Sequence, residues 1–319
     1  MRVAAEALLE SLSSQQASVG HMSFSEEERY NWSLVPLSVR QRAGLRLVNM
    51  TIEQQELAFE LVRSGLSERG FEEARQIIHL DSILRELDRS QKLGNDYVRD
   101  PEMYKLAIFG QPGSEQAWTW RVEGHHLSLH FTVRDKHLLS PAPLFLGAMP
   151  ATVPGGPEQG LRTLEREAAL GRALLATLSE SQRESAVVSR EPNVRFRTGE
   201  GRHADSSSLP KGLAFSEMSS DQKAAMTALV LYHLSRWPDE IADQRWARIE
   251  DSGLDRLSFG WSGGDDPNDG HCYLIRGTDF VIEYENSAGR PGGANHPHVA
   301  WRELVSDWGD EQRNGEVAG

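Results

Sequence analysis

The amino-acid sequence predicts an α+β fold, with a central and mainly antiparallel sheet built from two chain segments, about 104–148 and 256–303, and flanked by helices. Three observations support this prediction. Hydrophobic residues recur with helical spacing over 2–13 and 51–90 and again over 160–189 and 219–253. In the two named segments the period changes to two, and aromatic and β-branched residues become frequent. Each segment is too short to cover itself, so pairing both in one sheet is the economical architecture.

The predicted helices carry start and stop signals. Residues 2–13 have an apolar stripe at helical spacing. Thr51 precedes Gln54 by three residues, which is a capping-box pattern, and Gly65 marks the end of that helix. A second long amphipathic helix is expected over 67–90. Further helices are expected over 160–189, 219–237 and 238–253, the last with Pro238 in its first turn.

The predicted strands lie between turn signals. Glycines at 110–113 and the polar residues 134–136 separate the strands of the first segment. The expected strands are 104–110, 117–124, 125–133, 137–148, 256–264, 271–277, 279–286 and 298–304. Residues 190–212 have no period and are expected to form a long surface loop, which is also a candidate lid. No internal repeat is evident in the sequence.

Composition excludes several classes of function. The chain has 319 residues and a formal net charge of −13, with no basic stripe, which argues against a nucleic-acid partner. A single cysteine, Cys272, excludes an intrachain disulfide framework and cysteine-rich metal sites, so nitrogen and oxygen ligands remain. Acidic residues at Glu6 and Glu10 interrupt the N-terminal apolar stretch, and no window reaches about 18 apolar residues. We therefore expect no membrane partner and a cytoplasmic location.

Two histidine clusters interrupt the predicted strands, "EGHH" at 123–126 and "NHPH" at 295–298. Side chains alternate between the two faces of a strand. The glutamate of the first cluster therefore shares a face with the first histidine, and the two histidines of the second cluster share one face. Pairing the two strand segments in one sheet would bring both clusters together, which predicts a metal site.

The residue types define the ligands of such a site. Imidazole and carboxylate together suit a divalent transition metal, namely zinc, iron, copper or manganese. The preferred ligands are His125, His296 and His298, and the second-line ligands are His126 and His271. Glu123 is expected to be a further ligand or a general base. Arg121, on the same strand face, either orients an anionic substrate or pairs with Glu123.

Other interpretations remain open for these residues. A histidine taken alone is more often a hydrogen-bonded core residue than a ligand, and only the clustering favours a site. Glu283 and Glu285 share one face of their strand and suit acid–base chemistry if buried, although a solvated strand face is the commoner arrangement. The motifs of serine hydrolases, phosphate loops and dinucleotide-binding folds are absent.

Motifs in order along nearly the whole chain, among them "SGLSERG", "WTWRVEGHHLSLHF", "FGWSGG", "FVIEYEN" and "GANHPHVAWRE", resemble the family catalogued as domain of unknown function 3500. The resemblance implies a single domain over 1–319. Within it, the hydrophobic pattern predicts an N-terminal helical part at about 1–100. It supplies no activity. His130 stands where this family commonly has asparagine, so the resemblance also implies that His130 is not an essential ligand.

Two functional hypotheses follow. The first is a metal-dependent enzyme, either a hydrolase or an oxygenase, that acts on a small polar or anionic molecule through the His/Glu site. The second is a non-catalytic module whose histidine- and tryptophan-rich pocket binds a small ligand. A purely structural role of the histidines is a third, weaker alternative. The oligomeric state, the metal and the reaction are left open.

Overall fold

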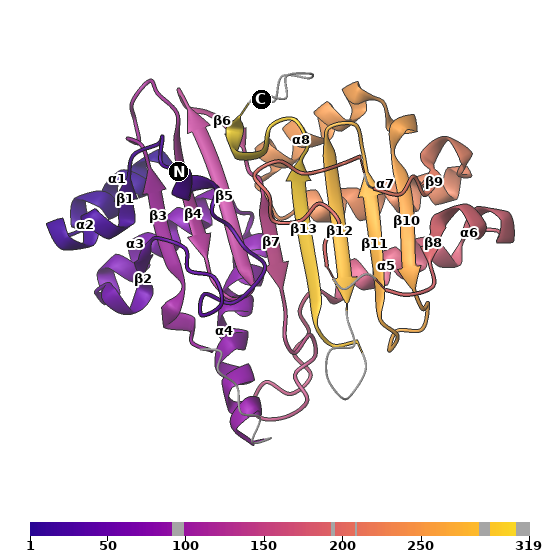
Figure 1. Cartoon of the computed structure of the whole chain (residues 1–319), viewed down its shortest axis with the longest axis horizontal. Coiled ribbons are helices and arrows are strands. Elements are labelled where there is room, and N and C mark those ends of the chain that lie inside the picture. Colours follow the sequence, from indigo (N-terminus) through magenta and orange to yellow (C-terminus); the bar gives the residue numbers. More distant parts are fainter. Residues whose placement is uncertain (91–98, 193–194, 208, 287–293, 311–319) are drawn as a thin grey trace. The chain divides into compact units, whose positions relative to one another are not determined.

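Two units make up the chain in the computed structural model, Met1–Phe145 with Val305–Gly319, and Leu146–Leu304. The structure describes residues 1–90, 99–192, 195–207, 209–286 and 294–310. Figure 1 shows the elements of both units. The α+β class and the mainly antiparallel strands are confirmed in each unit. The single domain over 1–319 and the pairing of both segments in one sheet stay predictions.

The first unit combines an antiparallel meander with two pairs of helices. Its helices are α1 (Arg2–Ser11), α2 (Ser14–Gly20), α3 (Ile52–Gly65) and α4 (Glu68–Ser90). Its strands are β1 (His21–Met22), β2 (Leu45–Arg46), β3 (Lys105–Phe109), β4 (Trp118–Glu123), β5 (Leu127–Arg134) and β6 (His137–Ser140). The short β1 pairs parallel with β3, and β2 pairs antiparallel with it. The predicted capping box of Thr51 and Gln54 is confirmed at the start of α3.

The second unit has the same kinds of elements. Its helices are α5 (Glu165–Ala176), α6 (Glu180–Ala186), α7 (Ser220–Leu234) and α8 (Asp239–Ser252). Its strands are β8 (Val187–Ser189), β9 (Leu213–Ala214), β10 (Ser258–Gly263), β11 (His271–Arg276), β12 (Phe280–Asn286) and β13 (Pro297–Glu303). Strand β7 (Leu144–Gly147) contains residues on both sides of the boundary at Phe145. No helix of the described residues is long and apolar enough to cross a membrane.

Three predicted elements were wrong in detail. The strand expected over 137–148 is divided into β6 and β7, because Pro141 and Pro143 between them lack the N–H that a strand ladder requires. The helix expected over 160–189 is divided into α5 and α6, because Ser179 begins a new helix with its own capping box. Pro238 precedes the first residue of α8 as its N-cap.

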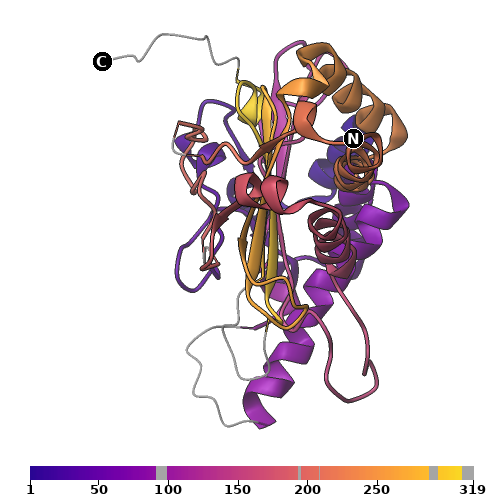
Figure 2. The same ribbon diagram turned by 90° about the vertical axis from the view of Figure 1, so that its right-hand side faces the viewer.

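The long strands of each unit have helices on one face and an irregular segment on the other. In the second unit, Figure 2 shows α5 and α7 on one side of the sheet and segment 190–212 on the opposite side. Tyr273 faces the helices, where its hydroxyl lies 2.8 Å from Nε2 of His233 on α7. Among its described residues, segment 190–212 contains no helix or strand, as predicted, but Phe196, Thr198 and Leu209 are buried. Its role as a lid stays a prediction.

The two units repeat one order of elements, although no internal repeat is evident in the sequence. In each unit two helices precede a short strand, an irregular segment, a second short strand, two longer helices and a meander. The first short strand pairs parallel with the first long strand of the meander, and the second pairs antiparallel with it. The arrangement of β1 and β2 on β3 is therefore that of β8 and β9 on β10.

The register of the two meanders matches residue by residue. Trp120 pairs with Ile108 on one side and Phe131 on the other. Tyr273 pairs with Trp261 and Tyr284, so each equivalent residue in the second unit has a number higher by 153. The turn glycines also correspond, since Gly124 N–H donates to the carbonyl of Leu127 and Gly277 N–H to that of Phe280. Each of these positions in one meander thus has a defined counterpart in the other.

The helix caps repeat as well. Gln16 closes the capping box of Ser13 and donates from Nε2 to Oε1 of Gln54, the capping glutamine of α3. Gln182 closes the capping box of Ser179 and donates in the same way to Gln222, the capping glutamine of α7. The same side-chain hydrogen bond therefore joins α2 to α3 in the first unit and α6 to α7 in the second.

Candidate functional site

Two histidines of the first unit occupy the tight turn between β4 and β5. Strand β4 ends at Glu123, so the strand alternation predicted through His125 is interrupted by this turn. Gly124 is required there, because a Cβ atom at this position would lie 1.9 Å from the ring of Tyr104. The rings of His125 and His126 stack with centroids 3.6 Å apart. The turn therefore presents both imidazoles together.

A carboxylate from α4 completes a group of three metal-ligating side chains. Oδ1 of Asp81 accepts a hydrogen bond from Nδ1 of His125 at 2.6 Å. One ligand atom each from Asp81, His125 and His126 lies within 4.8 Å of the other two, and all three side chains are buried. One carboxylate and two imidazoles form a donor set that suits zinc, iron or manganese. The structure thus brings the predicted ligands His125 and His126 together with a residue that the sequence prediction did not include.

A tyrosine and an arginine surround this group. The Tyr104 hydroxyl lies 3.4 Å from the backbone N–H of His126. Burial, and then the charge of Asp81, raise the pKa of Tyr104 well above its usual value, so its hydroxyl stays protonated. Nη1 of Arg99 lies 3.0 Å from Nδ1 of His125 and also contacts Nε2 of the same ring. The group therefore has a permanent positive charge on one side.

An open pocket adjoins the group within the first unit. Its volume is about 520 Å³, including solvent at the mouth, and its wall contains Asp81, His125 and Tyr104. Arg46 and Lys105 place two positive charges on that wall, and Asp81 and Asp100 place two negative charges there. Burial, and then the charges of nearby arginines, lower the pKa of Lys105 from 10.5. Arg46 and Lys105 are the groups of this wall that would pair with a small anionic molecule.

Glu123 and Arg121, predicted as catalytic residues, are fully buried in other contacts. Oε2 of Glu123 accepts from Nε of Arg42 at 3.1 Å, and Oε1 accepts from the Ser128 hydroxyl at 2.7 Å. Burial alone would raise the pKa of Glu123, but the hydrogen bond and charge of His130, together with the arginine charges, lower it. Of the two alternatives for Arg121, pairing with Glu123 is not observed.

Arg121 instead fixes the irregular segment that covers the sheet. Its guanidinium donates to the backbone carbonyls of Asn31 at 3.0 Å and Ala43 at 2.8 Å, and it pairs with the carboxylate of Glu28 at 2.7 Å. These contacts bind residues 28–43 to β4. They indicate an anchoring role, and the predicted role of Arg121 in substrate binding stays a prediction.

The second histidine cluster lies at the start of β13 in the second unit. The rings of His296 and His298 lie edge to face with centroids 4.4 Å apart. Nδ1 of His298 contacts Oε1 of Glu285 on the neighbouring strand β12, and the backbone N–H of His296 donates to Asn286 at 3.0 Å. The predicted convergence of His125 with this cluster involves residues of different units, and it stays a prediction.

His271, a second-line ligand in the prediction, has the contacts of a core residue. Its ring stacks on Trp261 at 5.1 Å with an interplanar angle of 7°. Nδ1 donates to the carbonyl of Asp269 at 2.9 Å, and Nη1 of Arg172 lies 3.2 Å from Nε2. Burial, as the largest cause, lowers the pKa of this imidazole. Its ring nitrogens are therefore engaged in packing and hydrogen bonding.

A family model matches residues 1–310, and its description is "Protein of unknown function (DUF3500)". The chain belongs to this family. The match confirms the resemblance noted in the sequence, and it covers both units and both histidine clusters of this DUF3500 member. Neither the curated proteins nor the solved structures include a match to the chain. The family description names no reaction, so the chemistry rests on the site itself.

Asp81 was missed although the sequence contains a signal for it. The aspartate lies four residues after Ile77 and three before Leu84, which places it on the buried stripe of α4. A buried carboxylate needs a hydrogen-bond donor or a cation. An acidic residue within an apolar helical stripe is therefore a candidate ligand. In this protein, Asp81 accepts a hydrogen bond from His125.

Proposed function

We propose that this DUF3500 member is a metal-dependent enzyme acting on a small anionic molecule, with Asp81, His125 and His126 as ligands of a divalent transition metal. The observation that supports the proposal most directly is the geometry of this group, with three buried donor atoms within 4.8 Å of one another. The adjoining pocket gives a substrate access to Asp81 and His125. The cytoplasmic location and the absence of a nucleic-acid partner remain part of the proposal, in keeping with the net charge of −13.

The side chains around the group have separate roles in this proposal. A bound divalent ion acts as a Lewis acid or lowers the pKa of a coordinated water, which suits hydrolysis, whereas a redox-active ion suits oxygen chemistry. Lys105 and Arg46 attract the anionic group of the substrate. Tyr104 keeps its proton and donates a hydrogen bond to the carboxylate of Asp81. This hydrogen bond helps to orient the carboxylate.

A non-catalytic binding module is the second candidate, and one observation favours it. The guanidinium of Arg99 contacts both ring nitrogens of His125, where it opposes the binding of a metal cation. The adjoining pocket, with Arg46 and Lys105 in its wall, would then hold an anion without a metal. Metal content separates the two candidates.

Elemental analysis of protein purified without an affinity tag tests the proposal. About one transition-metal ion per chain is expected, and a His125→Ala/His126→Ala variant should lose it because only one ligand of the group remains. His137→Ala, which removes an exposed histidine of β6, is the matched control and should keep the metal. Metal-free wild-type protein, with unchanged thermal stability after metal addition, would contradict the enzyme and favour the binding module.

The same measurement tests the ligand role predicted for the second cluster. A His296→Ala/His298→Ala variant that keeps its metal shows that the first unit is sufficient, whereas loss of metal confirms the predicted role of His296 and His298. Circular dichroism of each variant distinguishes ligand loss from unfolding.

Arg99 provides a further test with the opposite sign. Replacing Arg99 with glutamine removes a positive charge next to His125, so zinc affinity should rise by about tenfold or more, since a charge pair at contact distance is worth about 1 to 4 kcal/mol. Titration of zinc in competition with a chelator measures this change. Weaker zinc binding in the variant would show that Arg99 supports the site, in disagreement with the proposal.

A further inference from the structure

Two cations stand opposite each other in the wall of the open pocket of the first unit. Arg46 on β2 and Lys105 on β3 are directly paired residues of an antiparallel ladder, so their side chains lie on the same face of the sheet. Both line the pocket that Asp81 and His125 also line. Like charges at directly opposite positions destabilise a sheet, and the charge of Arg46 contributes, after burial, to the lowered pKa of Lys105. The first unit therefore holds two positive charges together at a cost in stability.

Neither cation forms an ion pair in the part of the chain that the structure describes. Nζ of Lys105 donates to two neutral oxygens, the carbonyl of Arg42 at 2.6 Å and Oε1 of Gln41 at 3.5 Å. An ammonium group has three N–H donors, so one donor remains for a ligand. The guanidinium of Arg46 forms no hydrogen bond or ion pair with any described residue. Both positive charges are thus uncompensated within the described chain.

The two aspartates of the same wall, in contrast, have partners. Oδ1 of Asp81 accepts from Nδ1 of His125 at 2.6 Å. Oδ2 of Asp100 lies 3.7 Å from Nη1 of Arg85, and its Oδ1 accepts from the backbone N–H of Glu102 at 3.0 Å. The charges of the wall that still need a counter-charge are therefore the positive ones.

The internal repeat shows that the fold does not require this pair of cations. Strand β9 pairs with β10 as β2 pairs with β3. In the second unit, Ala214 stands at the position of Arg46, and Ser258 stands at the position of Lys105. Both counterparts are small and neutral. The same strand pairing thus forms without the repulsion, which indicates that the cations of the first unit serve a ligand.

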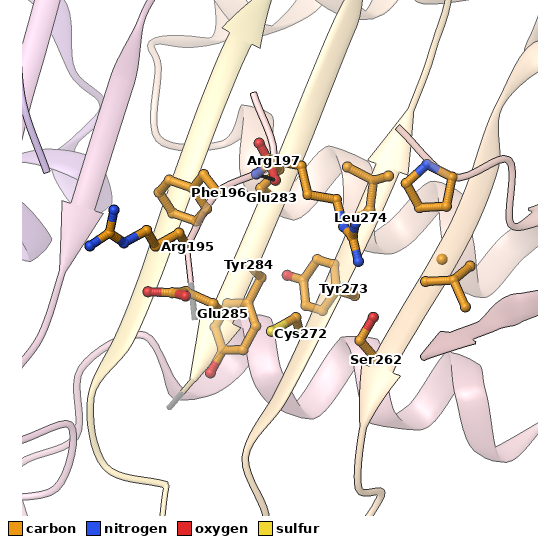
Figure 3. A pocket seen from close by; sticks show the side chains of 13 residues that line it. Arg195, Phe196, Arg197, Ser262, Cys272, Tyr273, Leu274, Glu283, Tyr284 and Glu285 are labelled. Atoms are coloured by element: carbon orange, nitrogen blue, oxygen red, sulfur yellow. Dashed lines mark hydrogen bonds between the residues drawn. The ribbon is translucent and has the colours of Figure 1, made fainter. Parts of the chain in front are cut away.

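The covered face of the second unit has no comparable space for a ligand. Its hollow under segment 190–212 (Figure 3) has room for about one water molecule. The carboxylate of Glu283 in its wall accepts from the backbone N–H groups of Arg197 at 2.6 Å and Thr198 at 3.0 Å. This buried charge anchors the covering segment, as Arg121 does in the first unit. Since Arg121 anchors residues 28–43, the pair of cations in the first unit is not needed for that purpose.

The donors of the first-unit pocket fit a carboxylate better than a phosphate. A guanidinium binds a carboxylate through two parallel N–H donors, and the remaining ammonium donor of Lys105 adds a third. Phosphate sites commonly add a cradle of backbone N–H groups. In the short 3-10 helix Pro101–Met103 beside the pocket, the N–H groups of Glu102 and Met103 already donate to Asp100. This helix therefore offers no backbone donor to a phosphate.

The rest of the pocket defines the body of the ligand. Leu37 and Met103 add apolar side chains to the wall. The space between the side chains accommodates a molecule of about six non-hydrogen atoms. A short aliphatic chain would contact this apolar surface while its carboxylate pairs with the two cations.

We propose that the pocket binds a short-chain carboxylate, with its carboxylate group between Arg46 and Lys105 and its carbon chain against Leu37 and Met103. Its identity as the substrate rests on the proposed function, whereas its binding does not. Metal content tests the proposed function, and the affinities of carboxylate probes test this site. The two can therefore fail separately.

Calorimetric titration of the whole chain with three probes tests the proposal. Butyrate and butyramide have the same number of non-hydrogen atoms, and only butyrate is charged. Butyrate should bind at least about tenfold more tightly than butyramide, because its hydrogen bonds to Arg46 and Lys105 are charge-assisted. Inorganic phosphate should bind more weakly than butyrate, because it lacks the apolar chain. Absence of butyrate binding at millimolar concentration, equally tight binding of butyramide, or tighter binding of phosphate would each overturn the proposal.

Substitution of Arg46 gives an independent test. Arg46→Ala introduces the residue found at the counterpart position of the second unit and should weaken butyrate binding by about tenfold or more, with butyramide binding unchanged. Arg134→Ala removes the same charge at an exposed position outside the pocket and should leave both affinities unchanged. Butyrate binding that survives Arg46→Ala would contradict the proposal. If Arg46→Ala does not fold, Arg46→Gln, which keeps most of the side-chain length, decides the outcome.

Discussion

Replacing Glu123 with alanine is expected to lower the free energy of unfolding by about 3 to 5 kcal/mol, because it leaves the buried guanidinium of Arg42 without its carboxylate partner. Glu123 and Arg42 are both fully buried, with Nε of Arg42 3.1 Å from Oε2 of Glu123. The Ser128 hydroxyl also loses its acceptor. Denaturant unfolding at constant m-value measures the change.

A matched control separates this effect from surface charge. Glu102→Ala removes an exposed carboxylate and should change stability by less than about 0.5 kcal/mol. Metal content per folded chain should be unchanged in Glu123→Ala, because Glu123 is absent from the group of Asp81, His125 and His126. A variant that loses metal or activity at wild-type stability would instead support the predicted role of Glu123 as ligand or general base.

The pH dependence of stability gives a second readout for Glu123. Its pKa in the folded protein lies below its usual 4.5, mainly through His130 and the arginine charges that outweigh the effect of burial. A group with a depressed folded pKa contributes stability above its unfolded pKa and loses that contribution as the pH falls through its folded pKa. The wild type should therefore lose stability below about pH 4.5 more steeply than Glu123→Gln.

The elements of the fold were predictable where the local pattern is strong. The amphipathic stripes of α3 and α4 and the alternation in β10–β13 specify these elements directly. The division into α5 and α6 was missed, because Ser179 lies within a stretch that is helical on both sides. The short strands β1, β2, β8 and β9 were also missed, since two or three residues show no measurable period.

The internal repeat was not visible in the sequence, because the two units share the order and pairing of their elements but few identical side chains. Gly124 and Gly277 keep the same turn, and Ser13 and Ser179 keep the same cap. Buried positions of the sheets changed in size and polarity between the units. Hydrophobic periodicity reflects which positions are buried and not which residues occupy them. It therefore predicts the same elements in both units without revealing that one unit repeats the other.

Two of the three members of the candidate metal group were visible in the sequence. His125 and His126 are adjacent after a glycine, so their proximity required no tertiary information. Asp81 lies 44 residues away on a helix, and only packing of α4 against the sheet brings it to His125. For Arg121, the sequence predicted the strand face correctly but not the contacts. Its partners belong to residues 28–43, an irregular segment whose position the hydrophobic pattern does not predict.

The final prediction concerns the counterpart of the metal group in the second unit. His126 corresponds to Asp279, and a small cavity there is lined by Asp279, Arg245 and Glu303. Nε of Arg245 lies 3.1 Å from Oε1 of Glu303, and both side chains are buried. Near the position equivalent to His126, the second unit therefore has a buried ion pair, whereas the first unit has the group of Asp81, His125 and His126.

Breaking this pair from one side should cost about 3 to 5 kcal/mol, whereas removing both charges together should cost much less. Arg245→Met and Glu303→Leu are the single variants, and their combination completes a double-mutant cycle in denaturant unfolding. The expected non-additivity follows because each single variant leaves one buried charge without its partner, while the double variant leaves none. Metal content should stay at the wild-type value in all three, since a structural ion pair holds no metal. Additive single effects would show that Arg245 and Glu303 are not energetically coupled. A loss of metal in any variant would show that this position contributes to metal binding.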